Sequence, residues 1–151
     1  MKTIRILALI GLLGLAAAPA LAREEATTII PGWWESTNKA TMVISKTEVE
    51  RRCITPADVD KILSGRINRH YTCTYPVKRV GDGKMYFQGT CVDKRGRQVN
   101  VTARGTYAPT AFTLSADLSG KYGGIPLAAT MSTSARRIGD TCLGKPVKIK
   151  G

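Results

Sequence analysis

The sequence predicts a mainly β protein, a strongly curved antiparallel meander of about seven strands that forms a half-open or closed barrel. One short α-helix is expected to cover its concave face. Apolar and polar residues alternate through most of residues 33–138, as in strands that bury one face. Short loops rich in Gly, Asp and Pro separate these segments. Only residues 56–64 show helical spacing, and so wide a sheet with so small a cover tends to curl.

The first 22 residues are typical of an export signal. Lys2 and Arg5 precede the apolar stretch 6–18, and the small residues of Ala20-Leu21-Ala22 suit signal peptidase. We expect cleavage after Ala22 and a location in the periplasm. The alternative is a membrane anchor, but the apolar stretch is shorter than the roughly 20 residues that span a bilayer.

The mature chain is expected to be a single domain over residues 23–151, with a short basic tail at 143–151 and no transmembrane segment. The chain has a formal net charge of +12, and removal of Lys2 and Arg5 leaves +10. Such a charge attracts anionic partners such as lipid headgroups, lipopolysaccharide, acidic glycans or nucleic acid. The basic residues are scattered, which also suits an ordinary soluble surface. Export argues against nucleic acid as the partner.

Two adjacent tryptophans fall on the first strand, where neighbours point to opposite faces. Trp34 shares the dry face with Met42, and a second strand at 47–54 adds Val49 to that face. Trp33 falls on the wet face, so we expect it to be exposed and able to anchor a protein partner. On the second strand, the residues expected on the wet face are Glu48, Glu50 and Arg52.

The helix at 56–64 has a clear beginning and end in the sequence. Thr55 is a good N-cap, Pro56 suits the first helical position, and Asp58 lies in the first turn. Gly65 is expected to end the helix. Its apolar stripe consists of Val59, Ile62 and Leu63.

From Tyr71 onward the alternation predicts five further strands of one sheet. Aromatic residues on its dry face either fill the core or line a cavity for an apolar ligand. The sequence leaves both alternatives open. These residues, with Trp34 from the first strand, are Tyr71, Tyr75, Phe87, Tyr107 and Phe112.

Loop lengths predict the register of these strands. A three-residue loop centred on Asp82 sets Val77 opposite Phe87, whereas a two-residue turn would place dry residues opposite wet ones. A second three-residue loop and a four-residue loop follow, and the four-residue loop inverts the parity of the next strand. The second three-residue loop is expected at 94–96 and the four-residue loop at 108–111. A flexible loop is expected at 120–124.

Four cysteines behind an export signal predict two disulfide bonds. The register of the hairpin places Cys73 opposite Cys91, and the pair Cys53–Cys142 follows by elimination. A zinc site is the less favoured alternative because the cysteines show no Cys-x-x-Cys spacing.

The sequence contains few residues typical of catalysis. His70 is the only histidine and is expected on the wet face at a strand start. Nucleophile elbows, phosphate-binding loops and dinucleotide fingerprints do not appear. We expect no catalytic residue, metal or cofactor. Paired acids occur in glycosidases, but a ladder of charges on a solvated face is preferred for Glu35, Glu48 and Glu50 beside Lys39 and Arg52.

Four short motifs recur together in one known family. They are Pro31-Gly32-x-Trp34-Glu35, Cys53-Ile-Thr-Pro56, the hairpin pair Cys73 and Cys91, and Gly139-Asp140-x-Cys142. Over residues 31–142 the chain resembles the DUF3617 family of small exported proteins, found largely in Gram-negative bacteria. The resemblance implies export, one domain and the cysteine framework. It implies no activity, since the family's function is unknown, and it assigns no role to Trp33, where members usually have an aliphatic residue.

Taken together, these features predict a non-catalytic periplasmic binding or accessory protein. It would hold an apolar or amphiphilic ligand in the curved sheet, or dock an anionic envelope component on its basic surface. The alternative is a subunit that binds a protein partner through Trp33. A small hydrolytic enzyme is the least favoured interpretation.

Overall fold

Eight antiparallel strands form one sheet in the computed structural model, which describes residues 28–66 and 70–150. The order across the sheet is β3-β4-β5-β6-β7-β1-β2-β8, and no described pairing joins the edge strands β3 and β8. The elements are β1 (Gly32–Thr41), β2 (Ser45–Ile54), α1 (Pro56–Ser64), β3 (Tyr71–Gly81), β4 (Lys84–Asp93), β5 (Gln98–Ala108), β6 (Ala111–Tyr122), β7 (Ile125–Gly139) and β8 (Val147–Lys150).

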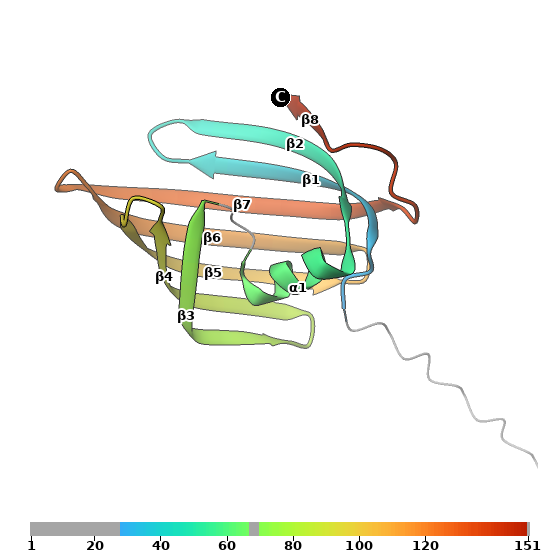
Figure 1. Cartoon of the computed structure of the whole chain (residues 1–151), viewed down its shortest axis with the longest axis horizontal. Helices are drawn as coiled ribbons and strands as arrows, with labels where there is room; N and C mark the ends of the chain where they lie inside the picture. The colour runs from blue at the N-terminus through green and yellow to red at the C-terminus, as the bar shows by residue number, and fades with distance from the viewer. Residues whose placement is uncertain (1–27, 67–69, 151) are drawn as a thin grey trace, which may run out of the picture.

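The sheet bends so strongly that β3 crosses the direction of β7, and α1 lies against the concave side (Figure 1). The predicted mainly β meander with one short helix is confirmed, and the sheet is open. The expected basic tail contains an eighth strand, since β8 pairs with β2 at the edge. The expected export signal lies outside the described residues. In the described part of the chain, no helix has the length and apolar character needed to cross a bilayer.

Short turns keep the central strands in register. Pro109-Thr110 is a two-residue turn, shorter than expected but also even in length, so Tyr107 lies opposite Phe112 and the parity inverts as predicted. The β6–β7 turn is also tighter than expected, because β6 continues to Tyr122 and only two glycines separate the strands. Both glycines have positive φ, as a two-residue hairpin turn requires.

The β3–β4 turn differs from the expected three-residue loop. Asp82 and Gly83 have φ values of 49° and 69° and form a two-residue turn. Phe87 therefore lies opposite Lys78, and the expected pairing with Val77 is wrong.

A β-bulge corrects the register farther along this hairpin. The shift occurs at Tyr75 and Pro76, and beyond it Cys73 lies opposite Cys91. Proline has no backbone N–H to donate, so it suits a bulge on an edge strand. The structure has the disulfide Cys73–Cys91 that the register predicted, and also Cys53–Cys142.

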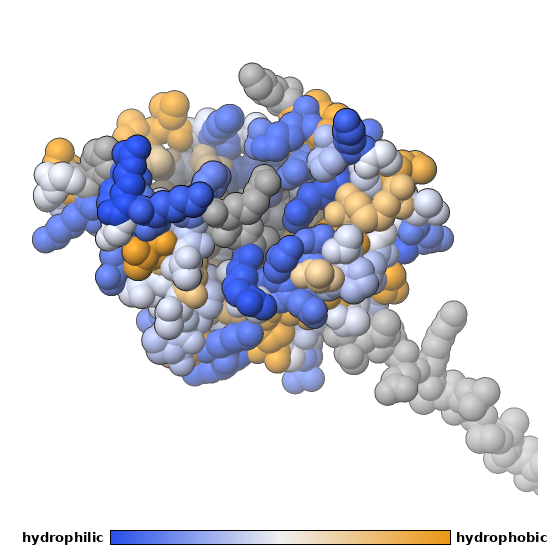
Figure 2. Space-filling view, in the orientation of Figure 1, coloured by the Kyte–Doolittle hydropathy of each residue, from blue (hydrophilic) through white to orange (hydrophobic). Residues whose placement is uncertain are grey.

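The β1–β2 turn reverses the expected facing of β2. Met42, Val43 and Ile44 form a three-residue turn, so Met42 is exposed and its expected place on the dry face is wrong. Because the turn is centred on Val43, Trp34 lies opposite Arg52. The side of β2 that we expected to face solvent, with Glu48, Glu50 and Arg52, therefore shares the face of Trp34. Apolar side chains are visible at the end of the molecule that carries the β1–β2 and β6–β7 turns, as well as elsewhere on this side (Figure 2).

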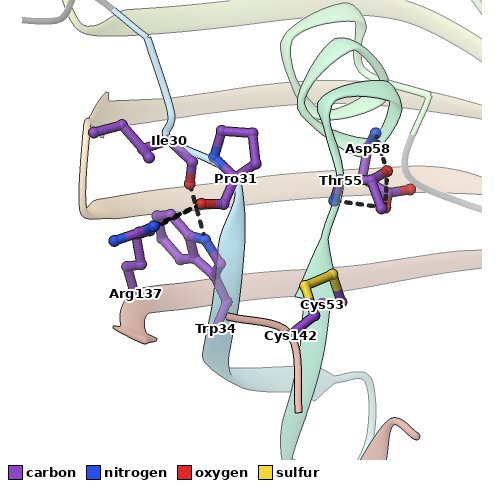
Figure 3. The surroundings of a disulfide bond; sticks show 8 residues. All are labelled: Ile30, Pro31, Trp34, Cys53, Thr55, Asp58, Arg137 and Cys142. Carbon is purple, nitrogen blue, oxygen red and sulfur yellow. Dashed lines mark hydrogen bonds between the residues drawn. A yellow bond between two sulfur atoms is a disulfide. The ribbon is translucent and has the colours of Figure 1, made fainter. Parts of the chain in front are cut away.

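Both tryptophans are buried. Trp34 is 1% exposed, packs against Phe112 at 5.5 Å between ring centroids, and donates from Nε1 to the Ile30 carbonyl at 3.1 Å (Figure 3). Trp33 is only 8% exposed, between Cys53 on β2 and Gly139 on β7. The expectation of an exposed Trp33 is wrong, so the premise of a partner anchor is wrong as well. Trp33 shares its face of the sheet with Cys53, whose disulfide to Cys142 brings the segment after β7 to that face.

Hydrogen bonds join the segment before β1 to the end of β7. The Arg137 guanidinium on β7 donates to the Pro31 carbonyl from Nε at 3.0 Å and from a terminal nitrogen at 2.9 Å (Figure 3). It also pairs with Asp140. The Cys53–Cys142 disulfide then ties the segment after β7 to β2. Residues before β1 and after β7 are thus held at one end of the sheet.

The bulge on β3 generates a testable prediction at Gly89. A Cβ added there would collide with the backbone carbonyl of Thr74, whereas a Cβ at Gly81, in the same hairpin, would meet open space. We expect Gly89→Ala to lower the free energy of unfolding by about 2 kcal/mol or more, and Gly81→Ala to change it by less than about 0.5 kcal/mol. Urea unfolding of both variants measures the difference, and equal effects would contradict the bulge.

Candidate functional site

The concave face is filled at one end and hollow at the other. The filled end lies under α1, whose buried residues Val59 and Ile62 join a compact core. Next to this core lies a pocket of about 960 Å³. Other members of the core are Ile29, Trp34, Ile54, Met85, Phe87, Cys91, Val101, Ala103, Phe112 and Ala135.

The floor of the pocket is apolar and is built by three neighbouring strands. Strand parity directs alternate side chains of β5, β6 and β7 to the concave face. Small residues among them, such as Ala103 and Ala116, leave the space unfilled. The other apolar floor residues are Val101, Leu114, Leu118 and Met131, and the polar side chains of Thr133 on β7 and Asn38 on β1 lie at their edge.

The rim of the pocket is charged, with basic residues in excess. Arg52 and Glu50 come from β2, Lys61 and Asp58 from α1, and Lys148 from β8, while Arg66 follows the C-cap of α1. The rim thus has four basic side chains (Arg or Lys), two acidic ones (Asp or Glu) and His70.

The rim cations differ in how far their charge is compensated. Lys61 pairs with Asp58 at 3.1 Å, and Lys148 lies 3.6 Å from Glu48. Arg52 has no ion pair among the described residues, although it is not fully exposed. A guanidinium in this position can bind an anionic group bidentately.

The helix that forms one wall is capped at both ends. Asp58 Oδ2 accepts from the Thr55 backbone N–H at 3.1 Å and from the Thr55 hydroxyl at 2.8 Å, while the Asp58 N–H donates to that hydroxyl at 3.3 Å. This is a capping box. The Thr55 hydrogen bonds, with help from Lys61, lower the pKa of Asp58. At the other end Gly65 adopts φ +77° and ends the helix as predicted.

Tyr75 joins the helix to the sheet beside the pocket. Its hydroxyl donates to the Gly65 carbonyl at 3.0 Å, and its ring packs on Phe87 at 5.2 Å between centroids. Burial raises the pKa of the Tyr75 hydroxyl, so it stays protonated and keeps donating. Tyr75 therefore positions α1 as a wall of the pocket.

The aromatic residues singled out from the sequence divide between core and pocket. Tyr71 and Tyr75 line the pocket, together with Cys53, Cys73 and Cys91. The others do not: Trp34, Phe87 and Phe112 are buried in the core, and Tyr107 packs against it.

Sequence reasoning missed the charged rim. The alternation of β2 predicts Glu50 and Arg52 on the wet face, because Val49 and Cys53 alternate with them as the dry residues. A three-residue turn centred on Val43 was the available signal, since it places Arg52 opposite Trp34. Lys148 carried no signal, because its place depends on the pairing of β8 with β2.

The expected ladder of Glu35, Glu48 and Glu50 is wrong, because only Glu35 lies on the outer face of the sheet and Glu48 and Glu50 lie on the opposite face. Glu35 accepts from Arg51 and from Arg136, each at 2.7 Å, and not from Lys39 or Arg52. The hydrogen bond from Arg136, followed by that from Arg51, lowers the pKa of Glu35. Glu35 thus joins β1 to both of its neighbours.

Two carboxylates, those of Glu50 and Asp58, border the pocket. Among the described residues, no cluster of three or more His, Cys, Asp or Glu side chains could hold a metal ion. All four cysteines are in disulfides, and a disulfide sulfur is no thiolate nucleophile. His70 is exposed and lies at the pocket rim. The arrangement is suited to binding a ligand.

The capping box predicts a pH dependence. Because folding lowers the pKa of Asp58, its charge stabilises the fold above the ordinary pKa of about 3.9, and this contribution is lost as the pH falls through the folded value. We expect the free energy of unfolding to decrease below about pH 5 in the wild type, and to decrease less in Asp58→Asn. Denaturant titrations from pH 7 to pH 3 measure this. Asp60→Asn, at an exposed aspartate of the same helix, is the control and should follow the wild type.

No curated protein matches the chain. A family model described as a protein of unknown function, DUF3617, matches residues 29–142. That range contains the core, both disulfides, α1 and the pocket floor. The chain belongs to the DUF3617 family.

Proposed function

We propose that this protein binds an anionic amphiphile in the pocket of its concave face, as a non-catalytic binding or accessory protein of the periplasm. The observation that carries the proposal is a pocket of about 960 Å³ with an apolar floor and a mainly basic rim. The apolar chain of the ligand would lie on the floor, and its anionic head would meet the rim.

The apolar residues of the floor favour an apolar chain as the buried part of the ligand. Ligand pockets in proteins typically enclose about 300–1,000 Å³ and are lined mainly by apolar side chains. The floor residues on β5, β6 and β7 carry no charge, and all but Thr133 are apolar. The Thr133 hydroxyl donates to the Asn38 side chain at 2.8 Å, so its hydrogen bond is already made within the protein. A chain of methylene groups would gain about 0.8 kcal/mol for each group that it removes from water.

The rim supports an anionic head. Four basic side chains surround the pocket against two acidic ones, and one of those, Asp58, is paired with Lys61. Arg52 and Arg66 both lack an ion pair in the described chain, and each has a guanidinium that can bind a carboxylate or phosphate. Placement in the periplasm rests on the signal-like residues 1–22 and would give the protein access to envelope lipids.

A pair of neighbouring substitutions on β6 tests the pocket. Ala116 lines the floor, whereas the adjacent Ser115 is exposed. We expect Ala116→Trp to fill the cavity and weaken binding of a dansyl-labelled fatty acid by tenfold or more, with Ser115→Trp binding like the wild type. Fluorescence titration gives both dissociation constants. Circular dichroism confirms that each variant is folded.

The same titration gives the result that would overturn the proposal. If folded Ala116→Trp binds the fatty acid as tightly as Ser115→Trp, the ligand does not occupy this pocket. Absence of binding by the wild type to fatty acids, lysophospholipids and phosphatidic acid would also count against it.

The rim is tested with two ligands of equal chain length, a fatty acid and the corresponding fatty alcohol. We expect Arg52→Gln to weaken binding of the acid by roughly 3- to 10-fold, a loss typical of a partly solvated charged hydrogen bond, and to leave the alcohol unaffected. Arg104→Gln removes an equal charge from an exposed position away from the pocket lining. It should change neither affinity. Equal losses for acid and alcohol would show that Arg52 shapes the pocket and does not bind the head.

A further inference from the structure

We infer that the end of the sheet carrying the β1–β2 and β6–β7 turns docks on an anionic lipid bilayer. Here this end is called the hairpin end, and its apolar residues are Met42, Val43, Ile44 and Ile125. This inference goes beyond the proposed pocket and does not depend on it, because none of these residues lines that pocket.

The hairpin end exposes large apolar side chains at its most prominent points. Val43 is 97% exposed, Ile44 81% and Ile125 70%. Thr41 pairs with Thr130, and Lys121 with Pro126, so the two turns lie at the same end of the sheet, as Figure 1 shows. Apolar atoms are visible at that end in Figure 2. The turns at the opposite end, Asp82-Gly83 and Pro109-Thr110, contain no large apolar residue. An exposed apolar group of this kind marks an interaction surface.

The charge around these side chains identifies the partner. Exposed lysines flank both turns, with Lys39 and Lys46 on the β1–β2 hairpin and Lys121 on the β6–β7 hairpin. None of the three has an ion pair among the described residues. The neighbouring β4–β5 turn adds Lys94 and Arg95, which are also exposed.

Apolar tips surrounded by unpaired cations fit an anionic bilayer surface. The tips can enter the boundary between headgroups and acyl chains while the lysines meet anionic headgroups. A second copy of this chain fits less well, because two hairpin ends would bring like charges together.

Vesicle binding by the full chain tests the inference. The intact mass of the purified protein shows whether residues 1–22 are present, and all variants share that state. Co-flotation is measured with vesicles of phosphatidylcholine containing about 30% phosphatidylglycerol, and with pure phosphatidylcholine. We expect binding to the anionic vesicles at low salt, at least tenfold weaker binding to the neutral ones, and a decrease as salt rises.

Substitutions at the tips separate the hairpin end from the rest of the surface. Val43→Ser with Ile44→Ser should reduce partitioning to anionic vesicles about tenfold or more, since two aliphatic side chains no longer leave water. Leu143→Ser is the matched control, because Leu143 is 68% exposed and lies outside the hairpin end. It should bind like the wild type. These positions are exposed, so an unchanged melting temperature is expected for each variant.

Charge variants complete the design. Lys39→Gln with Lys46→Gln should weaken binding to anionic vesicles and leave the weak binding to neutral vesicles unchanged. Lys84→Gln, at an exposed lysine beside the β3–β4 turn, should have less than half of that effect.

Three results would overturn the inference. The first is wild-type vesicle binding by the Val43→Ser, Ile44→Ser variant. The second is a concentration-dependent dimer that this variant abolishes in sedimentation, with no vesicle binding by the wild type, which would identify a second copy as the partner. The third is loss of vesicle binding in Ala116→Trp alone, which would place the lipid contact in the pocket. Failure of the pocket proposal in the fatty-acid titration would leave the vesicle result unaffected.

Discussion

A mismatch in size between one helix and one sheet underlies the rest of this structure. Helix α1 has nine residues, about 14 Å in length, and it faces a sheet of eight strands. It can bury the dry face only near Trp34, Ile54 and Phe87. The remaining apolar surface is sheltered by curvature instead of by a second layer. Since small side chains such as Ala103 and Ala116 occupy the inner side of that curve, the sheltered space is a pocket.

Turn lengths decide which side chains reach that pocket. Each hairpin turn sets a register, and a shift of one residue exchanges the two faces of a strand. The three-residue β1–β2 turn brings Arg52 and Glu50 to the side of Trp34. On β3 a two-residue turn alone would have placed Cys73 out of line with Cys91, and the bulge at Tyr75 and Pro76 restores the alignment. The lengths of the turns therefore decide which side chains form the apolar floor and the charged rim.

The ends of the chain complete the pocket and hold the open sheet together. Arg137 binds the Pro31 carbonyl, so the segment before β1 is fastened to the end of β7. The Cys53–Cys142 disulfide holds the segment after β7 against β2, and β8 then pairs with β2. This return brings Lys148 to the rim. The sequence motifs around Trp34, Cys53 and Cys142 therefore lie on neighbouring segments at this end of the sheet.

The sequence alone determined the class of fold and the helix with its caps, because these depend on local spacing. The alternation of side chains and the Thr55 and Gly65 caps are readable over a few residues. The disulfide pairing was also predicted correctly, but the expected three-residue loop that gave Cys73–Cys91 is replaced by a two-residue turn and a bulge that together restore the same alignment. Only the tertiary structure decided that Trp33 is buried, and that Tyr71 and Tyr75 border a cavity while Phe112 fills the core. These outcomes depend on where the segment after β7 is bonded to β2 and on how far α1 reaches across the sheet. Both are contacts between residues distant in the chain, and side-chain periodicity within one strand carries no information about them.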